Sequence, residues 1–130
     1  MQRVLIVTIG IIITGMIMFN FLSRSSGIDI SAQEFKEKLE EERGVVIDVR
    51  SKMEYDEGHL KTTDQLIDFN AGEFHNKVDT LDKDKTYYLY CRSGNRSGQA
   101  ARLMKTKGFE NVYNIGGFDA LAQSGLDTEK

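Results

Sequence analysis

One loop of this sequence combines a single cysteine with the cations and small residues that can activate it. Cys91 directly follows the apolar run 87–90 (YYLY), and the next six residues (RSGNRS) include Arg92 and Arg96. Backbone N–H groups of such a loop, together with the N-terminus of a following helix, stabilise negative charge on the sulfur. Positive potential of this kind lowers the pKa of a thiol and favours the nucleophilic thiolate. We therefore predict that Cys91 is a catalytic nucleophile.

The residues that follow the cysteine are predicted to bind an anionic substrate. They are Arg92, Ser93, Gly94, Asn95, Arg96 and Ser97. The helix after the loop is expected to start near Arg96, where a positive side chain opposes the helix dipole unless an anion compensates it. A substrate anion is one candidate for that role.

A second pair of charged residues is expected near the same edge of the sheet. The β-branched run 45–47 is typical of a buried strand and ends at Asp48, with Arg50 two residues further on. Catalytic groups of parallel sheets gather outside the carboxyl ends of the strands. We predict that Asp48 and Arg50 form an ion pair that organises the site without contacting the substrate.

The rest of the chain alternates short strand patterns with helical patterns. Strands are expected at 28–30, 45–47, 66–69, 86–90 and 112–115, and helices at 31–42, 51–57, 73–78, 98–107 and 118–123. Gly116 and Gly117 are interpreted as a turn. This alternation predicts an α/β fold with a mostly parallel sheet and helices on both faces.

An apolar segment near the start of the chain predicts a membrane anchor. Residues 4–22 contain no charge and would span about 28 Å as a helix. No Ala-x-Ala-like cleavage site is evident, so we favour a transmembrane anchor over a cleaved signal peptide. The flanking charges place the following domain outside the cytoplasm, in the periplasm, with a secreted soluble form as the alternative. The predicted divisions are residues 1–26 (anchor or signal segment with a short linker) and 27–130 (one domain).

The charge and the cysteine count exclude several classes of function. From residue 27 onward the chain has 15 basic and 20 acidic residues, a net charge of −5. An acidic domain argues against nucleic acid as a partner. One cysteine allows no intramolecular disulfide and no cysteine-based zinc site, and no Glu/His pattern has metal-ligand spacing. We predict no metal and no cofactor.

From about residue 29 to residue 126 the sequence resembles the rhodanese family of sulfurtransferases. The resemblance rests on the segments 46–50 (VIDVR), 54–55 (EY), 58–60 (GHL), 91–97, 108–109, 112, 114–117 and 125–126. It implies a rhodanese-like fold and a Cys91 persulfide. The cysteine would take a sulfane sulfur from a small anionic donor, such as thiosulfate or a persulfide. It would then pass that sulfur to a thiophilic acceptor, namely a thiol, cyanide or an acceptor protein.

The sequence departs from the family pattern outside the cysteine loop. The segment 61–68 (KTTDQLID) stands where the family usually has a Gly-Ala pair and Asn-Ile-Pro, Leu121 replaces a common tryptophan, and Asp127 replaces a common proline. These changes affect the surface around the site and the preference for the donor.

Two other functions remain open at this point. A cysteine phosphatase also places a cysteine at a strand end and an arginine at a helix start. The phosphatase loop has five residues between its cysteine and its arginine, however. Here four residues separate Cys91 from Arg96, and the sixth residue after Cys91 is Ser97. The second alternative is a membrane-tethered rhodanese-like module that binds a partner or senses redox state, because a low-pKa thiol oxidises readily. Thiosulfate:cyanide transfer, hydrolysis of an aryl phosphate and trapping of a mixed disulfide would separate the three.

Overall fold

The computed structural model describes residues 27–130, and the predicted membrane segment at residues 4–22 lies outside them. Helices of the described part are α2 (Ala32–Glu41), α3 (Lys52–Glu57), α4 (Glu73–Lys77), α5 (Asn95–Thr106) and α6 (Phe118–Gln123), with a short 3-10 helix at Val78–Thr80. Its strands are β1 (Val45–Asp48), β2 (His59–Leu60), β3 (Gln65–Leu66), β4 (Tyr87–Cys91), β5 (Val112–Gly117) and β6 (Thr128–Glu129). Within residues 27–130, no helix has the length and apolar character needed to span a membrane.

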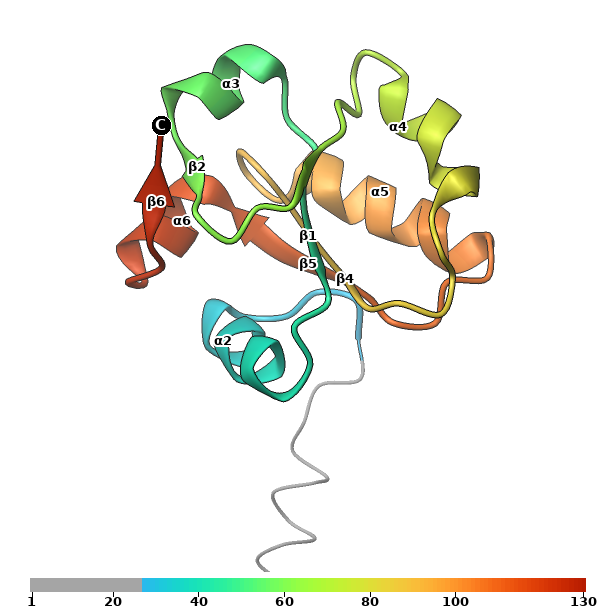
Figure 1. The fold of residues 1–130 in the computed structure, drawn as a ribbon, viewed down its shortest axis with the longest axis horizontal. Helices are drawn as coiled ribbons and strands as arrows, with labels where there is room; N and C mark the ends of the chain where they lie inside the picture. Colours follow the sequence, from blue (N-terminus) through green and yellow to red (C-terminus); the bar gives the residue numbers. More distant parts are fainter. Residues whose placement is uncertain (1–26) are drawn as a thin grey trace, which may run out of the picture.

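Four parallel strands form the central sheet in the order β3-β1-β4-β5 (Figure 1). In addition, β2 and β6 form a separate antiparallel pair. The carboxyl ends of β1 and β4 are adjacent, because Asp48 lies opposite Tyr90. The predicted α/β fold with a mostly parallel sheet is therefore confirmed.

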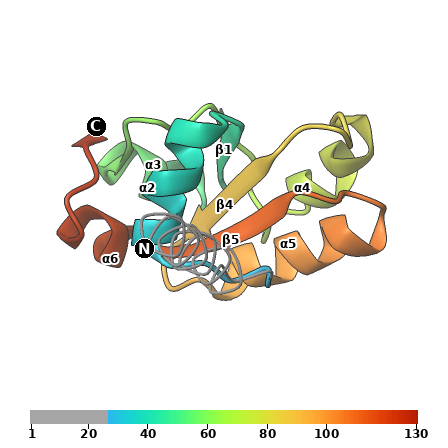
Figure 2. The same cartoon turned by 90° about the horizontal axis from the view of Figure 1, so that it is seen from below.

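The sheet is covered on both faces. All five residues of β4 are buried, and they alternate between two cores as the two-residue period of a strand requires. Tyr87, Leu89 and Cys91 pack in one core with residues of α4 and α5, and Tyr88 and Tyr90 pack in the other with residues of α2 and α6. Figure 1 shows the two pairs of helices on opposite sides of the strands, and Figure 2 shows α5 running along β4 and β5.

Several element boundaries differ from the predicted ones. Helix α5 begins at Asn95 rather than at the predicted residue 98, so Arg96 and Ser97 lie in its first turn. Gly116 and Gly117 are not a turn: they belong to β5 and pair with the end of β4. The strand predicted at 112–115 is not the last one, because β6 follows it. A strand of two residues is too short to show the two-residue period of a strand in the sequence.

Candidate active site

Cys91 is the last residue of β4, and the loop that leads into α5 covers its sulfur. The side chain is fully buried. The Gly94 N–H donates to Sγ at 3.0 Å, and the Ser97 hydroxyl does so at 3.3 Å. Burial raises the pKa of the Cys91 thiol. Hydrogen bonds from the Ser97 hydroxyl and from the backbone N–H groups of Ser97, Ser93 and Gly94 outweigh burial, so the pKa lies below its ordinary value.

Two glycines allow the cysteine loop to lie against β5. Gly94 precedes the first turn of α5 with φ at +92°, and a Cβ there would lie 3.3 Å from the Gly116 Cα. At Gly117 a Cβ would lie only 2.5 Å from the Arg92 carbonyl oxygen. A side chain at either position would therefore push the loop off the strand. Sequence reasoning named Gly94 but missed this role of Gly117.

Asn114 of β5 is hydrogen-bonded to the residues around the sulfur, and sequence reasoning did not name it as a site residue. Its side-chain N–H groups donate to the Gly94 carbonyl at 3.0 Å and to the Asp29 carboxylate at 2.9 Å. Its side-chain oxygen accepts from the Ser97 hydroxyl at 2.7 Å and from the Gly116 N–H at 3.1 Å. All four hydrogen-bonding positions of the amide are thus used. Asparagine has a low propensity for strands, so its presence within a predicted strand was the one sign in the sequence that could have marked it as a site residue.

The Ser97 hydroxyl connects Asn114 to the sulfur. It carries one hydrogen but lies near two acceptors, the side-chain oxygen of Asn114 and the sulfur of Cys91. The hydroxyl can donate to only one of them at a time, and a thiolate is a stronger acceptor than a thiol.

Arg96 pairs with Glu54 of α3. Both terminal nitrogens of its guanidinium donate to the carboxylate, at 2.8 and 2.9 Å. The hydrogen bond from Arg96 lowers the pKa of Glu54 to about 2. This carboxylate offsets the positive charge in the first turn of α5, and the pair joins α3 to that turn.

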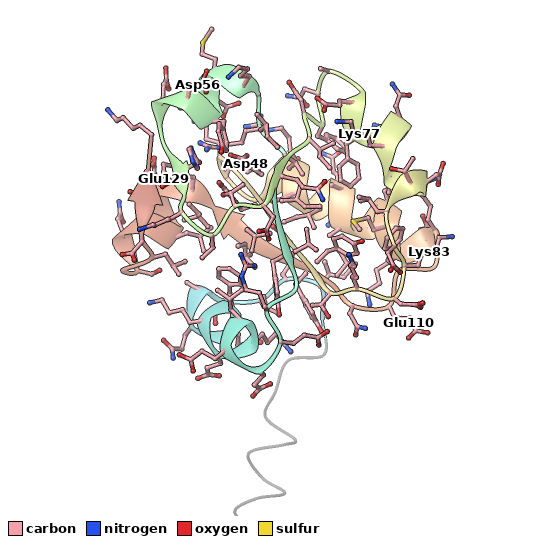
Figure 3. All side chains as sticks on the ribbon, in the orientation of Figure 1. Asp48, Asp56, Lys77, Lys83, Glu110 and Glu129 are labelled. Atoms are coloured by element: carbon pink, nitrogen blue, oxygen red, sulfur yellow. The ribbon has the colours of Figure 1, made fainter. Side chains whose placement is uncertain are left out.

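Asp48 and Arg50 form an ion pair at the end of β1, where Figure 3 labels Asp48. Both side chains are buried, and the closest nitrogen–oxygen distance is 2.8 Å. Arg50 also donates to the Gly58 carbonyl at 2.7 Å, and its guanidinium lies 4.6 Å from the centre of the Phe118 ring. The pair therefore joins β1 to the end of α3 and the start of α6.

A pocket of about 390 Å³ opens beside the cysteine loop. Its lining residues are Arg50, Glu54, Glu57, Gly58, Arg92, Phe118 and Asp119. Of the predicted substrate-binding residues, Arg92 therefore faces the pocket, and Ser97 lies buried against the sulfur. Ser93 and Asn95 are exposed, and the Ser93 hydroxyl oxygen accepts from the Asn95 N–H at 3.4 Å.

Comparison with protein families matches residues 31–124 to the Rhodanese-like domain, so the chain belongs to this family. The Bacillus subtilis protein "Putative sulfurtransferase YtwF" is 39% identical over 93 residues, covering 71% of this chain and 87% of that protein. "Putative sulfur carrier protein YrkF" from the same organism is 34% identical over 92 residues, which cover 70% of this chain and 48% of that protein. The tRNA uridine(34) hydroxylase of Erwinia tasmaniensis is 34% identical over 104 residues, covering 75% of this chain and 29% of that protein. The chain thus spans less than half of the length of the sulfur carrier protein and of the hydroxylase.

Solved structures show the same fold. A rhodanese-related protein from Thermoplasma volcanium has a TM-score of 0.67 at 25% identity, covering 79% of this chain and 98% of that one. A rhodanese-like domain protein from Staphylococcus aureus has a TM-score of 0.64 at 27% identity, covering 80% and 100%. A rhodanese with anions from E. coli has a TM-score of 0.56 at 28% identity, covering 66% and 96%. The family and the fold expected from the resemblance are therefore confirmed.

Proposed function

We propose that the domain is a sulfurtransferase in which Cys91 carries the transferred sulfur as a persulfide. The observation that carries the proposal is the position of the Cys91 sulfur at the end of β4, where Ser97 and Gly94 donate hydrogen bonds to it. These donors stabilise a thiolate, which is the form that attacks sulfur. Relatives named as a sulfurtransferase and a sulfur carrier support the proposal.

The first step loads the cysteine. The Cys91 thiolate attacks the outer sulfur of thiosulfate, a new sulfur–sulfur bond forms, and the bond to the sulfite sulfur breaks. Sulfite leaves with the electron pair, and the enzyme retains a persulfide anion. A small persulfide donor would react in the same way, with a thiolate as the leaving group.

The second step unloads the cysteine. A nucleophilic acceptor attacks the outer sulfur of the persulfide, and the bond between that sulfur and Sγ of Cys91 breaks. The electron pair returns to Sγ, which regenerates the thiolate that Ser97 stabilises. No external oxidant or reductant is needed over the full cycle.

The loop residues have different roles in this proposal. Arg92 is exposed at the pocket and adds positive charge for the anionic donor. Arg96 acts mainly by holding the first turn of α5 against Glu54, so Arg96→Ala should raise the KM for thiosulfate by displacing that turn and the loop before it. The E. coli rhodanese with anions supports an anionic donor for this fold.

The test is thiosulfate:cyanide sulfur transfer by the full chain, with Cys91→Ser as the control. Transfer that disappears in the variant supports the proposal. Hydrolysis of an aryl phosphate by the wild type would instead favour the phosphatase. A mixed disulfide formed without sulfur transfer would favour a redox sensor.

We also propose, from the sequence alone, that residues 4–22 anchor the domain at the outer face of a cytoplasmic membrane. The charge-free length of the segment supports this proposal. Fractionation of cells that express the full chain should place it in the membrane fraction, resistant to extraction by high salt. Recovery in the soluble fraction would contradict an anchor.

A further inference from the structure

The pocket beside the cysteine loop holds three charged side chains that lack a partner among residues 27–130. Two other charged residues of its lining are paired, Arg50 with Asp48 and Glu54 with Arg96. The unpaired groups are Arg92, Glu57 and Asp119, all of them exposed. The pocket therefore offers one free guanidinium and two free carboxylates to a ligand.

The size of the pocket points to a substrate larger than the sulfur donor. Thiosulfate has five atoms, whereas the pocket has a volume of about 390 Å³, within the range of sites that bind organic ligands. Thiosulfate bound at Arg92 would leave Glu57 and Asp119 without a partner, because these carboxylates carry charge of the same sign as the donor. The acceptor of the second step is the other molecule that must approach the loop.

We infer that this pocket binds the acceptor, and that the acceptor is an aminothiol. An ammonium group satisfies Glu57 and Asp119, and a carboxylate matches the planar donor face of Arg92. A zwitterionic amino-acid thiol such as cysteine meets all three groups. This inference rests on the proposed sulfur transfer and names the class of molecule that removes the sulfur.

The transfer step needs no further component. The thiolate of the aminothiol attacks the outer sulfur of the Cys91 persulfide, and the bond from that sulfur to Sγ breaks. The products are the Cys91 thiolate and the persulfide of the aminothiol. Arg92 is the first residue after Cys91 and lines the pocket, so the pocket lies at the end of β4 that carries the cysteine.

The experiment compares three thiol acceptors in a single turnover. Full-length protein is loaded with thiosulfate, freed of excess donor, and mixed at low salt with cysteamine, cysteine or 3-mercaptopropionate. Loss of the bound sulfur is followed by intact-protein mass spectrometry. The rate ratio of cysteamine to 3-mercaptopropionate is then compared between the wild type and Glu57→Gln/Asp119→Asn, because the intrinsic reactivity of each thiol cancels in this comparison.

The double variant should show a clear loss of preference for the ammonium group. Each exposed charge contributes about two- to fivefold, so removing both should lower the rate ratio by about four- to twenty-fivefold, and high salt should reduce the wild-type preference. Arg92→Gln should slow cysteine more than cysteamine, because only cysteine carries a carboxylate. The matched control is Glu110→Gln/Asp84→Asn, with the same change in net charge away from the pocket; Figure 3 labels Glu110 far from α3.

An unchanged rate ratio in Glu57→Gln/Asp119→Asn would overturn the inference, as would an equal fall in the control variant. Cyanide separates this failure from failure of the proposed function. If cyanide discharges the persulfide but the ratio of the cysteamine rate to the 3-mercaptopropionate rate is the same in the wild type and the pocket variant, the proposed sulfur transfer stands and the aminothiol acceptor is wrong. If no persulfide forms on Cys91, both proposals fail together.

Discussion

Ser97→Ala should raise the pKa of the Cys91 thiol while leaving the fold intact. The substitution removes the hydroxyl that lies 3.3 Å from Sγ, and the backbone donors of Ser93, Gly94 and residue 97 remain. The side-chain oxygen of Asn114 still accepts from the Gly116 N–H, so no buried acceptor is left without a partner. The effect should therefore appear in the ionisation of the cysteine rather than in stability.

The size of the effect follows from the loss of one hydrogen bond to a charged acceptor. Such a bond contributes about 1.5–3 kcal/mol, and each 1.4 kcal/mol is about a tenfold change in an equilibrium constant. The equilibrium constant for ionisation of the thiol should then fall roughly tenfold to a hundredfold. The titration is followed by the ultraviolet absorbance of the thiolate and by the pH dependence of alkylation with iodoacetamide.

Ser93→Ala is the matched control for this prediction. The Ser93 hydroxyl belongs to the same loop but contacts the Asn95 N–H and not the sulfur. Its removal should leave the ionisation of Cys91 unchanged. A Ser97→Ala protein that ionises like the wild type, or a Ser93→Ala protein with an equal change, would refute the hydrogen-bonding account of the thiolate.

The remaining predictions concern stability. Glu54 has a folded-state pKa of about 2 against an ordinary 4.5, so its pair with Arg96 stabilises the fold above pH 4.5 and is lost as the pH falls toward 2. Denaturant unfolding should show a loss of about 2–3 kcal/mol in Glu54→Gln at neutral pH and a flatter pH dependence between pH 5 and 2; an unchanged profile would contradict this. Gly94→Ala and Gly72→Ala both place a side chain at positive φ, which costs about 1–2 kcal/mol. Only Gly94→Ala adds a close contact, so this variant should be the less stable of the two, and its Cys91 should be alkylated at a rate different from that of the wild type. Equal losses in the free energy of unfolding would show that the contact does not matter.

The sequence identified the fold class because local patterns determine it. The run 87–90 alternates its side chains between two cores, and a strand buried on both faces reads as a continuous apolar segment. Cys91 at its end and a helix after it predict a loop over the sulfur. The order of these elements is a property of neighbouring residues, which a single sequence displays directly.

The partners of the site residues could not be predicted, because they come from distant parts of the chain. Arg96 appeared as a free cation for a substrate, but Glu54 lies 42 residues away in sequence and pairs with it. Asn114 and Asp29 are 85 residues apart. Nothing in one sequence states which carboxylate will meet which donor after folding. The pairing of Asp48 with Arg50 was easier to predict because only two residues separate them.

The most direct test of the central claim is the mass of the full-length protein after incubation with thiosulfate. We predict a gain of one sulfur mass that cyanide removes and that Cys91→Ser lacks. Absence of any adduct, or an adduct that persists in Cys91→Ser, would contradict a persulfide carried by Cys91.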